Sequence, residues 1–346
     1  MYLTEKEIMS QDEALQKTVD YIYGKKEEIA SFFKEHPGKK FTLFGCGSSY
    51  MLAKSGERFF SAFKGTTASA ISGGDFLVHN DYYRETIKDS IVIVLSRSGQ
   101  TSEIVRSVKI IKENGGNPVI SLSMKDDNDV MPYSDLDLTM DWCYDKSVCQ
   151  TRTVTNLYTA LLMLAGIYDG DTALLEEVKK AVGNSKEYME KYRPVLKGVA
   201  EKDWDNAIVL ADGPVTGIAE EGALAYTEIC MLSGKCFNLL DYRHGPVVLN
   251  NEKTLTVILI SDVEDKLQSD MVYDVKKHGG TVVTVSVSEE NRYDADAHIC
   301  IGDIRDFRVY GIPFIYVMQM SAYEKAILLG HNPDAPTGLD AFITLK

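Results

Sequence analysis

The sequence predicts an α/β fold built from two duplicated units, each a parallel sheet flanked by helices in a flavodoxin-like, three-layer arrangement. Short apolar runs alternate with stretches of helical periodicity along nearly the whole chain, as in strands joined by crossover helices. Two glycine landmarks also recur at nearly one spacing. Gly47 and Gly213 are 166 residues apart, and Gly115–Gly116 precede Gly279–Gly280 by 164 residues. An offset shared by separate landmarks indicates that one unit was duplicated.

The first half, expected over residues 1–190, holds N-terminal helices followed by the first unit. Residues 1–37 have roughly helical spacing of apolar side chains, and a His-Pro-Gly sequence then ends the run. Buried strands are expected at residues 41–44, 91–95 and 119–122. A helical pattern follows the first two strands, a polar turn is expected at 72–75, and a long helix follows residue 151.

The second half, expected over residues 191–346, repeats this pattern and ends in a C-terminal tail. Charged helices over roughly 173–203 lead into it. Its strands are expected at residues 207–211, 255–260 and 282–285. One helix is expected after the turn Asp212–Pro214, and another passes through Met271 and Val275. Alternating strands and helices imply that this sheet is parallel as well.

The composition excludes several classes of protein. The 346 residues include 51 Asp and Glu against 37 Lys and Arg, so the net charge is −14 and the overall field disfavours nucleic acid and anionic membranes. No apolar stretch reaches the ~18 residues of a membrane helix, and the first residues lack the features of a signal peptide. The six cysteines form no C-x-x-C pair, so neither zinc nor a disulfide framework is indicated. We therefore expect a cytoplasmic protein with reduced, mostly buried thiols.

The stretch Ser96–Thr101, which reads SRSGQT, is the strongest candidate for a ligand-binding turn. It follows a buried strand and precedes a helix with Ile104, Val108 and Ile111 on one face. Free N–H groups and the helix dipole attract anions at such an N-terminus, so Ser96, Arg97, Ser98, Gln100 and Thr101 are candidates for a phosphate cradle. An ordinary serine-rich N-cap on a crossover helix is the alternative.

A second hydroxyl-rich turn supports the phosphate interpretation. Ser48 and Ser49 follow the strand at residues 41–44, whereas the turn Asp212–Pro214 in the second half carries no such hydroxyls. Ligands of parallel α/β sheets bind beyond the carboxyl ends of the strands, where all three turns are expected. Ordinary strand-end turns would explain the glycines but not the uneven distribution of hydroxyls.

The second half supplies candidates for acid–base chemistry. Glu221 and Glu228 are seven residues apart on one expected helix, so they share a face. Apolar neighbours of Glu228 predict partial burial, which would raise the pKa of a carboxyl toward that of a general base. A surface glutamate on an amphipathic helix is the alternative.

His244 lies on an expected turn, next to Gly245 and Pro246, and is therefore a better candidate for proton transfer than His278 or His298. A purely structural loop histidine is the alternative. The sequence contains no H-E-x-x-H, EF-hand, Walker or G-x-G-x-x-G pattern. We therefore expect no metal, nucleotide or dinucleotide cofactor.

Together these short motifs resemble the tandem form of the sugar isomerase (SIS) domain family over about residues 22–346. The chain is similar to the isomerase half of glutamine–fructose-6-phosphate amidotransferase, to amino-sugar-phosphate deaminases and to fructosamine-6-phosphate deglycases. The motifs that carry the resemblance, in chain order, are Cys46–Ser49, Ser96–Thr101, Val148–Thr155, Glu221–Leu224, Glu228 and Arg243–Pro246.

The resemblance implies a role for each matched residue. Ser49, Ser96, Ser98 and Thr101 would bind the phosphate of a sugar phosphate, with Arg97 and Gln100 beside them. Ser48 and the segment Val148–Gln150 would contact the sugar chain, and Glu221 belongs to the same binding set. Glu228 would move a proton between C1 and C2, and His244 would open the sugar ring, lent by a neighbouring subunit of a homodimer or higher homo-oligomer.

The sequence departs from the pattern of glutamine–fructose-6-phosphate amidotransferase, called the synthase below, and these departures favour a different function. Ala225 stands where the synthase has a lysine one turn before its catalytic glutamate, Ala341 aligns with its imine-forming tail lysine, and Tyr2 is not a nucleophilic cysteine. We expect no glutaminase domain, and hence no glutamine-dependent synthesis. The expected function is deamination or deglycation of an amino-sugar or fructosamine 6-phosphate. A simple phosphosugar isomerase and a non-catalytic sugar-phosphate sensor remain as alternatives.

Overall fold

The computed structural model describes residues 2–263 and 265–345, without the side chain of Asp265. The chain forms two compact units that are interleaved along the sequence. The described residues of the first-sheet unit are 13–146, 152–179 and 340–345, and those of the second-sheet unit are 2–12, 147–151, 180–263 and 265–339. The expected division of the duplicated halves at residue 190 stays a prediction, because these units are defined by compactness and not by repetition.

The first-sheet unit contains five parallel strands in the order β2-β1-β3-β4-β5. Its strands are β1 (Lys40–Gly45), β2 (Thr67–Ser72), β3 (Ile91–Ser96), β4 (Val119–Ser123) and β5 (Leu136–Thr139). Every residue of β3 and β4 is buried, as expected for central strands covered on both faces. The strands expected at residues 41–44, 91–95 and 119–122 are therefore confirmed.

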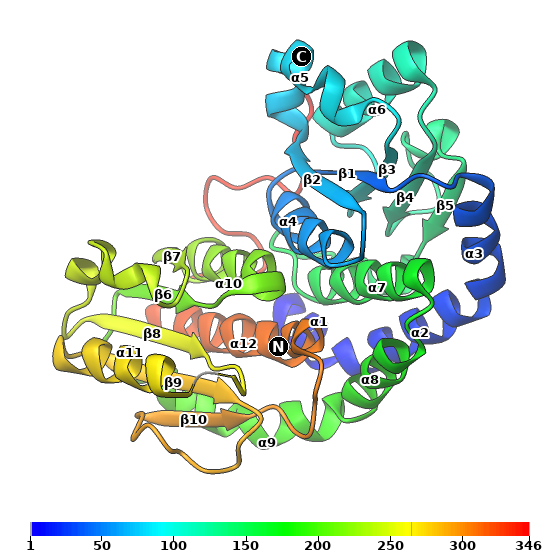
Figure 1. Cartoon of the computed structure of the whole chain (residues 1–346). Helices are drawn as coiled ribbons and strands as arrows, with labels where there is room; N and C mark the ends of the chain where they lie inside the picture. The colour runs from blue at the N-terminus through cyan, green and yellow to red at the C-terminus, as the bar shows by residue number, and fades with distance from the viewer. Residues whose placement is uncertain (1, 264, 346) are drawn as a thin grey trace. The chain divides into compact units, whose positions relative to one another are not determined.

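Helices cover both faces of this sheet (Figure 1). One face packs against α4 (Ser48–Ser61) and α7 (Arg152–Asp169), and the other against α5 (Gly73–Ile87) and α6 (Ser102–Gly115). The expected apolar face of α6 is confirmed, because Ile104, Val108 and Ile111 lie in the core beneath it. The polar turn expected at residues 72–75 is wrong, because β2 ends at Ser72 and α5 begins at the next residue.

The second-sheet unit repeats the topology, with five parallel strands in the order β10-β9-β8-β6-β7. Its strands are β6 (Asn206–Leu210), β7 (Ser233–Phe237), β8 (Thr254–Leu259), β9 (Thr281–Ser286) and β10 (Ala297–Cys300). Both sheets have the same strand order in sequence terms, 2-1-3-4-5, which is the flavodoxin-like order. The expected fold class and its duplication are confirmed.

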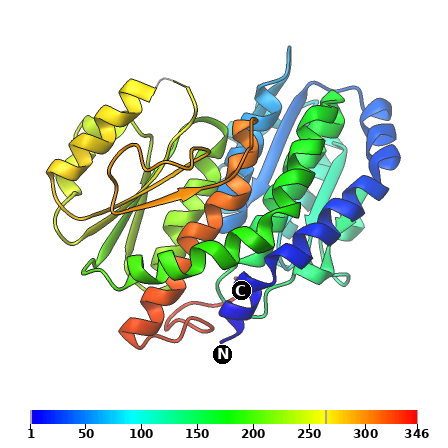
Figure 2. The same cartoon turned by 90° about the horizontal axis from the view of Figure 1, so that it is seen from below.

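Helices of the second-sheet unit also cover both faces of its sheet (Figure 2). One face packs against α10 (Thr216–Ile229), on which α12 (Gly311–Leu329) and then α9 (Ser185–Ala200) lie, while α11 (Asp265–Lys277) contacts β9. The N-terminal α1 (Leu3–Met9) packs on α12. The core under α11 contains Met271 and Val275, as their helical spacing predicts.

The remaining helices are α2 (Gln11–Gly24), α3 (Lys26–Glu35) and α8 (Thr172–Gly183). Short 3-10 helices are η1 (Met131–Tyr133), η2 (Asp141–Cys143), η3 (Gly213–Val215), η4 (Asp241–Arg243), η5 (Pro246–Leu249) and η6 (Phe307–Tyr310). No helix in the described ranges combines the length and the apolar character needed to cross a bilayer.

Candidate active site

The residues expected to bind phosphate lie at one edge of the first sheet. Ser48 and Ser49 are the first residues of α4, directly after β1, and the turn Ser96–Thr101 joins β3 to α6. Because β1 and β3 are neighbouring parallel strands, both turns lie at the same carboxyl edge. Ser48, Ser49, Ser96 and Ser98 are all at least 96% buried, so this edge is a recessed surface.

The turn Ser96–Thr101 is held open by hydrogen bonds to its own serines. The amide of Gly99 donates to Ser96 Oγ at 3.0 Å, and the amide of Gln100 donates to Ser98 Oγ at 3.1 Å. Gly99 has a φ of +61°, a conformation that glycine adopts without strain. The serine hydroxyls accept these bonds through oxygen and keep their hydrogens available to donate to a ligand.

Several donors of this edge have no partner within the described ranges. They are the amide N–H groups of Ser98 and Thr101 and the hydroxyls of Ser48, Ser49 and Thr101. Thr101 is the N-cap residue of α6, so these donors lie where the helix dipole favours negative charge. Five donors with no acceptor at a helix N-terminus form an arrangement suited to a phosphate.

Gln100 and Arg97 are engaged by other parts of the first-sheet unit. Gln100 Oε1 accepts a hydrogen bond from Lys125 Nζ at 3.0 Å. The Arg97 guanidinium is 96% buried, donates to the backbone carbonyl of Ala341, and lies 5.9 Å from the ring centroid of Tyr144. These side chains therefore fix the surroundings of the turn, and Arg97 joins it to the tail of the chain.

The tail residues of this unit run alongside the same turn. The amide of Ser102 donates to the carbonyl of Ile343 at 3.4 Å, and the amide of Leu345 donates to Ser102 Oγ at 3.1 Å. Ala341, which aligns with the imine-forming lysine of the synthase, thus lies in a segment that contacts the candidate phosphate turn. Within the described tail, residues 340–345, there is no lysine that could form an imine.

Two residues that the sequence reading missed support this turn. Asn128 Oδ1 accepts from the amides of Val130 at 3.2 Å and Met131 at 2.9 Å, which fixes the loop after β4 against Gly99. Lys125, in the same loop, holds Gln100. The sequence could have indicated them only by position. The loop after β4, the strand next to β3, begins at the same carboxyl edge of the sheet as the turn Ser96–Thr101.

Cys46, in the turn after β1, is a structural thiol. Burial and the nearby Glu103 carboxylate raise its pKa to about 11, so the thiol stays protonated near neutral pH. A protonated thiol is a poor nucleophile. All six cysteines are thiols, and three of them are fully buried. No group of three or more His, Cys, Asp and Glu side chains in the described part of the chain could hold a metal ion.

The other expected site residues belong to the second-sheet unit. Glu221 and Glu228 both lie on α10, where Glu221 is buried and Glu228 is partly buried, as its apolar neighbours predict. Gly222 on this helix lies so close to α12 that an added Cβ would be 2.4 Å from Met318 Cε. Tight packing of α10 against α12 therefore fixes the position of both carboxylates.

Val148 and Gln150 lie in a segment, residues 147–151, that is anchored at several points of the second-sheet unit. The amide of Val148 donates to the carbonyl of Asp334 at 2.9 Å, and Glu7 accepts from the hydroxyl and amide of Ser147. Gln319 Nε2 donates to the carbonyl of Thr151 at 2.9 Å. Glu7 is a buried carboxylate that the sequence gave no reason to select, because its partner is 140 residues away.

His244 lies on an exposed turn between η4 and η5. Its amide donates to the carbonyl of Asp241 at 2.9 Å, and Gly245 follows with a φ of +127°. The neighbouring Val248 is 80% exposed. The imidazole is therefore not packed into the core of its own unit, as expected for a loop histidine that is available for proton transfer.

The two sets of candidate residues are thus each described within one unit. The first-sheet unit carries Ser48, Ser49, Ser96, Arg97, Ser98, Gln100 and Thr101. The second-sheet unit carries Val148, Gln150, Glu221, Glu228 and His244. The first set shares one sheet edge, whereas the second set is distributed over α10, the segment 147–151 and the His244 turn.

The fold and the phosphate-suited edge define an α/β protein of flavodoxin-like topology with a ligand edge in its first sheet. Comparison with family models makes this class specific, because residues 36–166 match the SIS domain. The matched residues include β1 to β5 and both hydroxyl-rich turns of the first-sheet unit. The second-sheet unit is SIS-like in its strand order.

Curated relatives match nearly the whole chain. Glutamine–fructose-6-phosphate aminotransferases (isomerizing) from Shewanella oneidensis and Thermococcus kodakarensis are 21% and 26% identical over 99% of this chain. The match covers 58% of each relative, so the chain spans a little more than half the length of these proteins.

Solved structures share the fold. The chain is similar to glucosamine-6-phosphate deaminase from Thermotoga maritima, with a TM-score of 0.82, 23% identity and coverage of 99% of this chain and all of that chain. It is also similar to tagatose-6-phosphate ketose/aldose isomerase from Escherichia coli, with a TM-score of 0.86, 17% identity and coverage of 99% and 96%. At these identities the likeness concerns the fold.

Proposed function

We propose that this chain is a phosphosugar-processing enzyme that releases nitrogen from an amino-sugar or fructosamine 6-phosphate by proton transfer between C1 and C2. The observation that carries the proposal is the set of five donors at the carboxyl edge of the first sheet that find no acceptor among the described residues. Relatives named as a deaminase, a ketose/aldose isomerase and an isomerizing aminotransferase support the same class of substrate.

The phosphate would be held by donors that lie away from the reacting carbons. Ser98 and Thr101 present amide N–H groups, and the hydroxyls of Ser48, Ser49 and Thr101 complete the set. Charge-assisted hydrogen bonds of this kind supply binding energy that orients the sugar chain. The segment Val148–Gln150 would contact that sugar chain, and its anchors at Glu7 and Asp334 limit its movement.

Glu228 would act as the base. On a 2-amino sugar it removes the proton from C2 and returns it to C1, which converts the amine at C2 into an imine. On a fructosamine it moves the proton from C1 to C2, which leaves the imine at C1. Water then adds to the imine carbon, and ammonia or the free amine departs. Partial burial of Glu228 supports this role, because a shielded carboxylate is a stronger base than a solvated one.

His244 would transfer the proton that opens the sugar ring. Its exposure, together with the exposed Val248 in the adjacent η5, supports a homodimer or higher homo-oligomer in which this turn contacts a neighbouring subunit. An exposed histidine beside an apolar side chain can be covered by such a partner, which would place it in a shielded site. The proposal includes a cytoplasmic setting and requires no metal or nucleotide.

The test is a panel of 6-phosphates of glucosamine, galactosamine, fructosamine and fructoselysine, with fructose 6-phosphate as the nitrogen-free control. Ammonia, free amine and aldose phosphate are measured for the wild type, Glu228→Gln and Glu187→Gln. We expect nitrogen release from one member of the panel. Glu228→Gln should lower kcat by about 10²–10⁴-fold, the usual contribution of a general base. Glu187→Gln changes an exposed glutamate on α9 and should leave kcat unchanged.

Each other outcome has a distinct meaning. Full turnover by Glu228→Gln would exclude the proposed base. Ketose–aldose exchange without nitrogen release would identify a simple phosphosugar isomerase. Binding of a phosphosugar with no turnover in the whole panel would identify a sensor.

A further inference from the structure

The second sheet has a pocket of its own at its carboxyl edge. A cavity of about 360 Å³ lies beyond the ends of β6, β7 and β8. In the sheet, β6 lies between β7 and β8. The chain passes from β6 to β7 on one side and then crosses to β8 on the other side of β6. The carboxyl ends of such a pair form the crevice where ligands of open parallel sheets bind. The pocket lies entirely within the second-sheet unit and does not include the residues of the proposed reaction.

The walls of this pocket are mainly hydrocarbon. Its apolar lining residues are Leu239, Leu240, Leu259, Val263, Leu267 and Phe307. Leu239 and Leu259 are almost completely buried and form the base, whereas Leu267 on α11 is 42% exposed at the opening. Gly213 has a φ of +62°, and an added Cβ there would be 3.9 Å from the ring of Phe307, so backbone and ring lie close together. These walls suit a short aliphatic chain.

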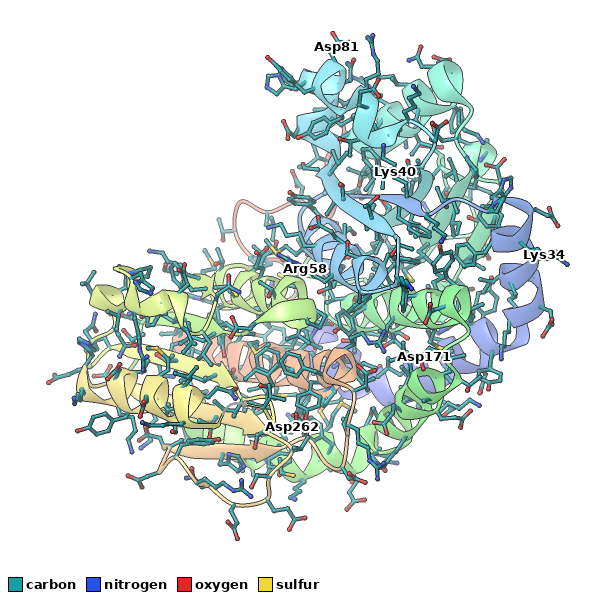
Figure 3. All side chains as sticks on the ribbon, in the orientation of Figure 1. Lys34, Lys40, Arg58, Asp81, Asp171 and Asp262 are labelled. Atoms are coloured by element: carbon teal, nitrogen blue, oxygen red, sulfur yellow. The ribbon has the colours of Figure 1, made fainter. Side chains whose placement is uncertain are left out.

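The polar residues of the pocket are two aspartates and a serine–glutamine pair whose members hydrogen-bond to each other. Gln268 and Ser261 bond to each other, since Ser261 N donates to Gln268 Oε1 at 2.8 Å and Gln268 Nε2 donates to Ser261 O at 3.1 Å. Asp212 Oδ1 accepts from the amide of Leu239 and from Asn238 Nδ2, both at 3.1 Å. Its other oxygen accepts no hydrogen bond from the described residues, and Asp262, labelled in Figure 3, is exposed at the rim.

The charge of the pocket selects the class of ligand. The lining residues include Asp212 and Asp262 but no lysine, arginine or histidine, and neither aspartate forms an ion pair within the described ranges. A phosphate or carboxylate ligand would be repelled by both carboxylates. A bare metal ion is a poor match, because the described residues form no cluster of three acidic, His or Cys ligands and most of the wall is apolar.

We propose that this pocket binds a primary aliphatic amine in its ammonium form. The ammonium group would contact the carboxylates of Asp212 and Asp262, and the hydrocarbon chain would pack against Leu240, Leu267 and Phe307. An ammonium group donates three hydrogen bonds and carries the complementary charge, and a chain of about four to six carbons covers the apolar wall. The inference does not rest on the proposed function, because it concerns a separate pocket and a ligand without phosphate.

The test compares ligands that differ in one property at a time. Isothermal titration at pH 7 with the full chain measures binding of n-pentylammonium chloride, 1-pentanol, sodium pentanoate and ammonium chloride. We expect pentylammonium to bind at least about tenfold more tightly than each of the other three, because only it has both the charge and the chain. Equal binding of 1-pentanol would overturn the role of the carboxylates, and no binding of pentylammonium would overturn the site.

Variants locate the binding and control for folding. Asp212→Asn keeps an oxygen acceptor for the amide of Leu239 but removes the charge, and Asp262→Asn changes an exposed side chain. Each should weaken pentylammonium about tenfold with an unchanged Tm, and Leu267→Ser should weaken it without affecting ammonium. Glu289→Gln removes an exposed charge outside the pocket and should have no effect. Unchanged binding in the Asp212→Asn, Asp262→Asn double variant would overturn the proposal.

Competition with a phosphosugar separates this site from the proposed reaction. We expect a saturating phosphosugar to leave pentylammonium binding unchanged. Displacement by the phosphosugar would assign the pocket to the phosphosugar site and overturn the inference. Failure to find turnover in the panel would affect only the proposed function.

Discussion

The two sheets have the same strand order, but their carboxyl edges carry opposite chemistry. The edge of the first sheet presents the hydroxyls of Ser48, Ser49 and Thr101 and the amide N–H groups of Ser98 and Thr101, which have no partner among the described residues. The edge of the second sheet presents leucine side chains and two aspartates. The duplicated scaffold therefore sets where a ligand can bind, while a few side chains at strand ends set the charge of that ligand.

The sharpest comparison concerns two glycines with nearly the same backbone conformation, Gly99 at φ +61° and Gly213 at φ +62°. An alanine Cβ at Gly99 would lie 2.4 Å from Asn128 Cβ, whereas at Gly213 the nearest atom is 3.9 Å away. Both substitutions carry the left-handed strain of about 1 kcal/mol, but only Gly99→Ala adds a clash, which is with the side chain of Asn128. We expect Gly99→Ala to lower the free energy of unfolding by about 3–5 kcal/mol and Gly213→Ala by about 1 kcal/mol in urea denaturation.

Equal losses of stability in the two variants would show that the loop after β4 moves away from Gly99 at little cost. That result would contradict the view that Asn128 fixes the phosphate turn. Phosphosugar binding of the folded Gly99→Ala fraction adds a second readout, which should fall as well.

Glu7 tests whether the segment 147–151 is positioned from within the second-sheet unit. Glu7→Ala removes the buried acceptor of the Ser147 amide, while the Ser147 hydroxyl can still donate to the carbonyl of Cys149 at 2.9 Å, so the loss of stability should be about 1–3 kcal/mol. Because this segment is expected to contact the sugar chain, kcat/KM should fall while inorganic phosphate still binds normally. Steady-state kinetics and phosphate titration measure the two effects. Glu187→Ala, at an exposed site on α9, is the control, and a parallel loss of phosphate binding would contradict the assignment.

Two threonines, one in each unit, test whether a hydroxyl at the carboxyl edge of the first sheet binds the ligand. Thr101 is the N-cap of α6, and Thr216 begins α10 in the second-sheet unit, where its hydroxyl donates to Gly213 O at 2.9 Å. Valine has the same shape without the hydroxyl. Thr101→Val should weaken phosphosugar binding about tenfold, the usual effect of one hydrogen bond to a charged group, with little change in Tm. Thr216→Val should leave the dissociation constant unchanged, and an equal effect of both would contradict the comparison.

Glu5→Gln should have the smallest effect on the free energy of unfolding. It tests the stability of the fold without changing the residues expected to bind the ligand. Burial would raise the pKa of Glu5, but hydrogen bonds from Arg193 and Tyr323 outweigh it and lower the pKa below 4.5. A lowered pKa stabilises the fold above pH 4.5, and this contribution is lost as the pH falls through the folded-state value. We expect Glu5→Gln to be about 1 kcal/mol less stable at pH 6, with the difference closing as the pH falls below 4.5 and through the lowered pKa of Glu5.

Denaturation at several pH values measures this closing difference. A constant difference between wild type and Glu5→Gln down to about pH 3 would contradict the lowered pKa. Phosphosugar affinity at pH 6 should be the same for both proteins, because Glu5 belongs to the second-sheet unit and not to the hydroxyl-rich edge.

The strands that the sequence predicted are the central ones, and the strands that it missed are mostly at the edges. β3, β4, β8 and β9 are buried along their whole length, so they appear as continuous runs of Val, Ile and Leu. The strands β2, β5 and β7, which the sequence did not predict, include exposed or half-exposed positions. Edge strands face solvent on one side, and their mixed composition gives no continuous apolar signal.

The candidate site shows the same limit of prediction. The hydroxyl-rich turn Ser96–Thr101 was visible because its residues are contiguous. Asn128, Lys125 and Glu7 were not visible, because each acts on a turn or segment that lies far from it in sequence. The guanidinium of Arg97 donates to the carbonyl of Ala341, 244 residues away, and its expected place beside the phosphate stays a prediction. Long-range partners of this kind leave no periodic pattern.

The sequence by itself determined the duplicated α/β architecture, because burial on both faces of a strand and the spacing of glycines are local properties of the chain. It also indicated which strand ends carry hydroxyls. Only the tertiary structure decided which loops reach those ends, which donors remain free, and that the second edge encloses an acidic, apolar pocket. The physical reason is that a carboxyl edge collects residues from several crossovers, and their meeting depends on strand order and packing.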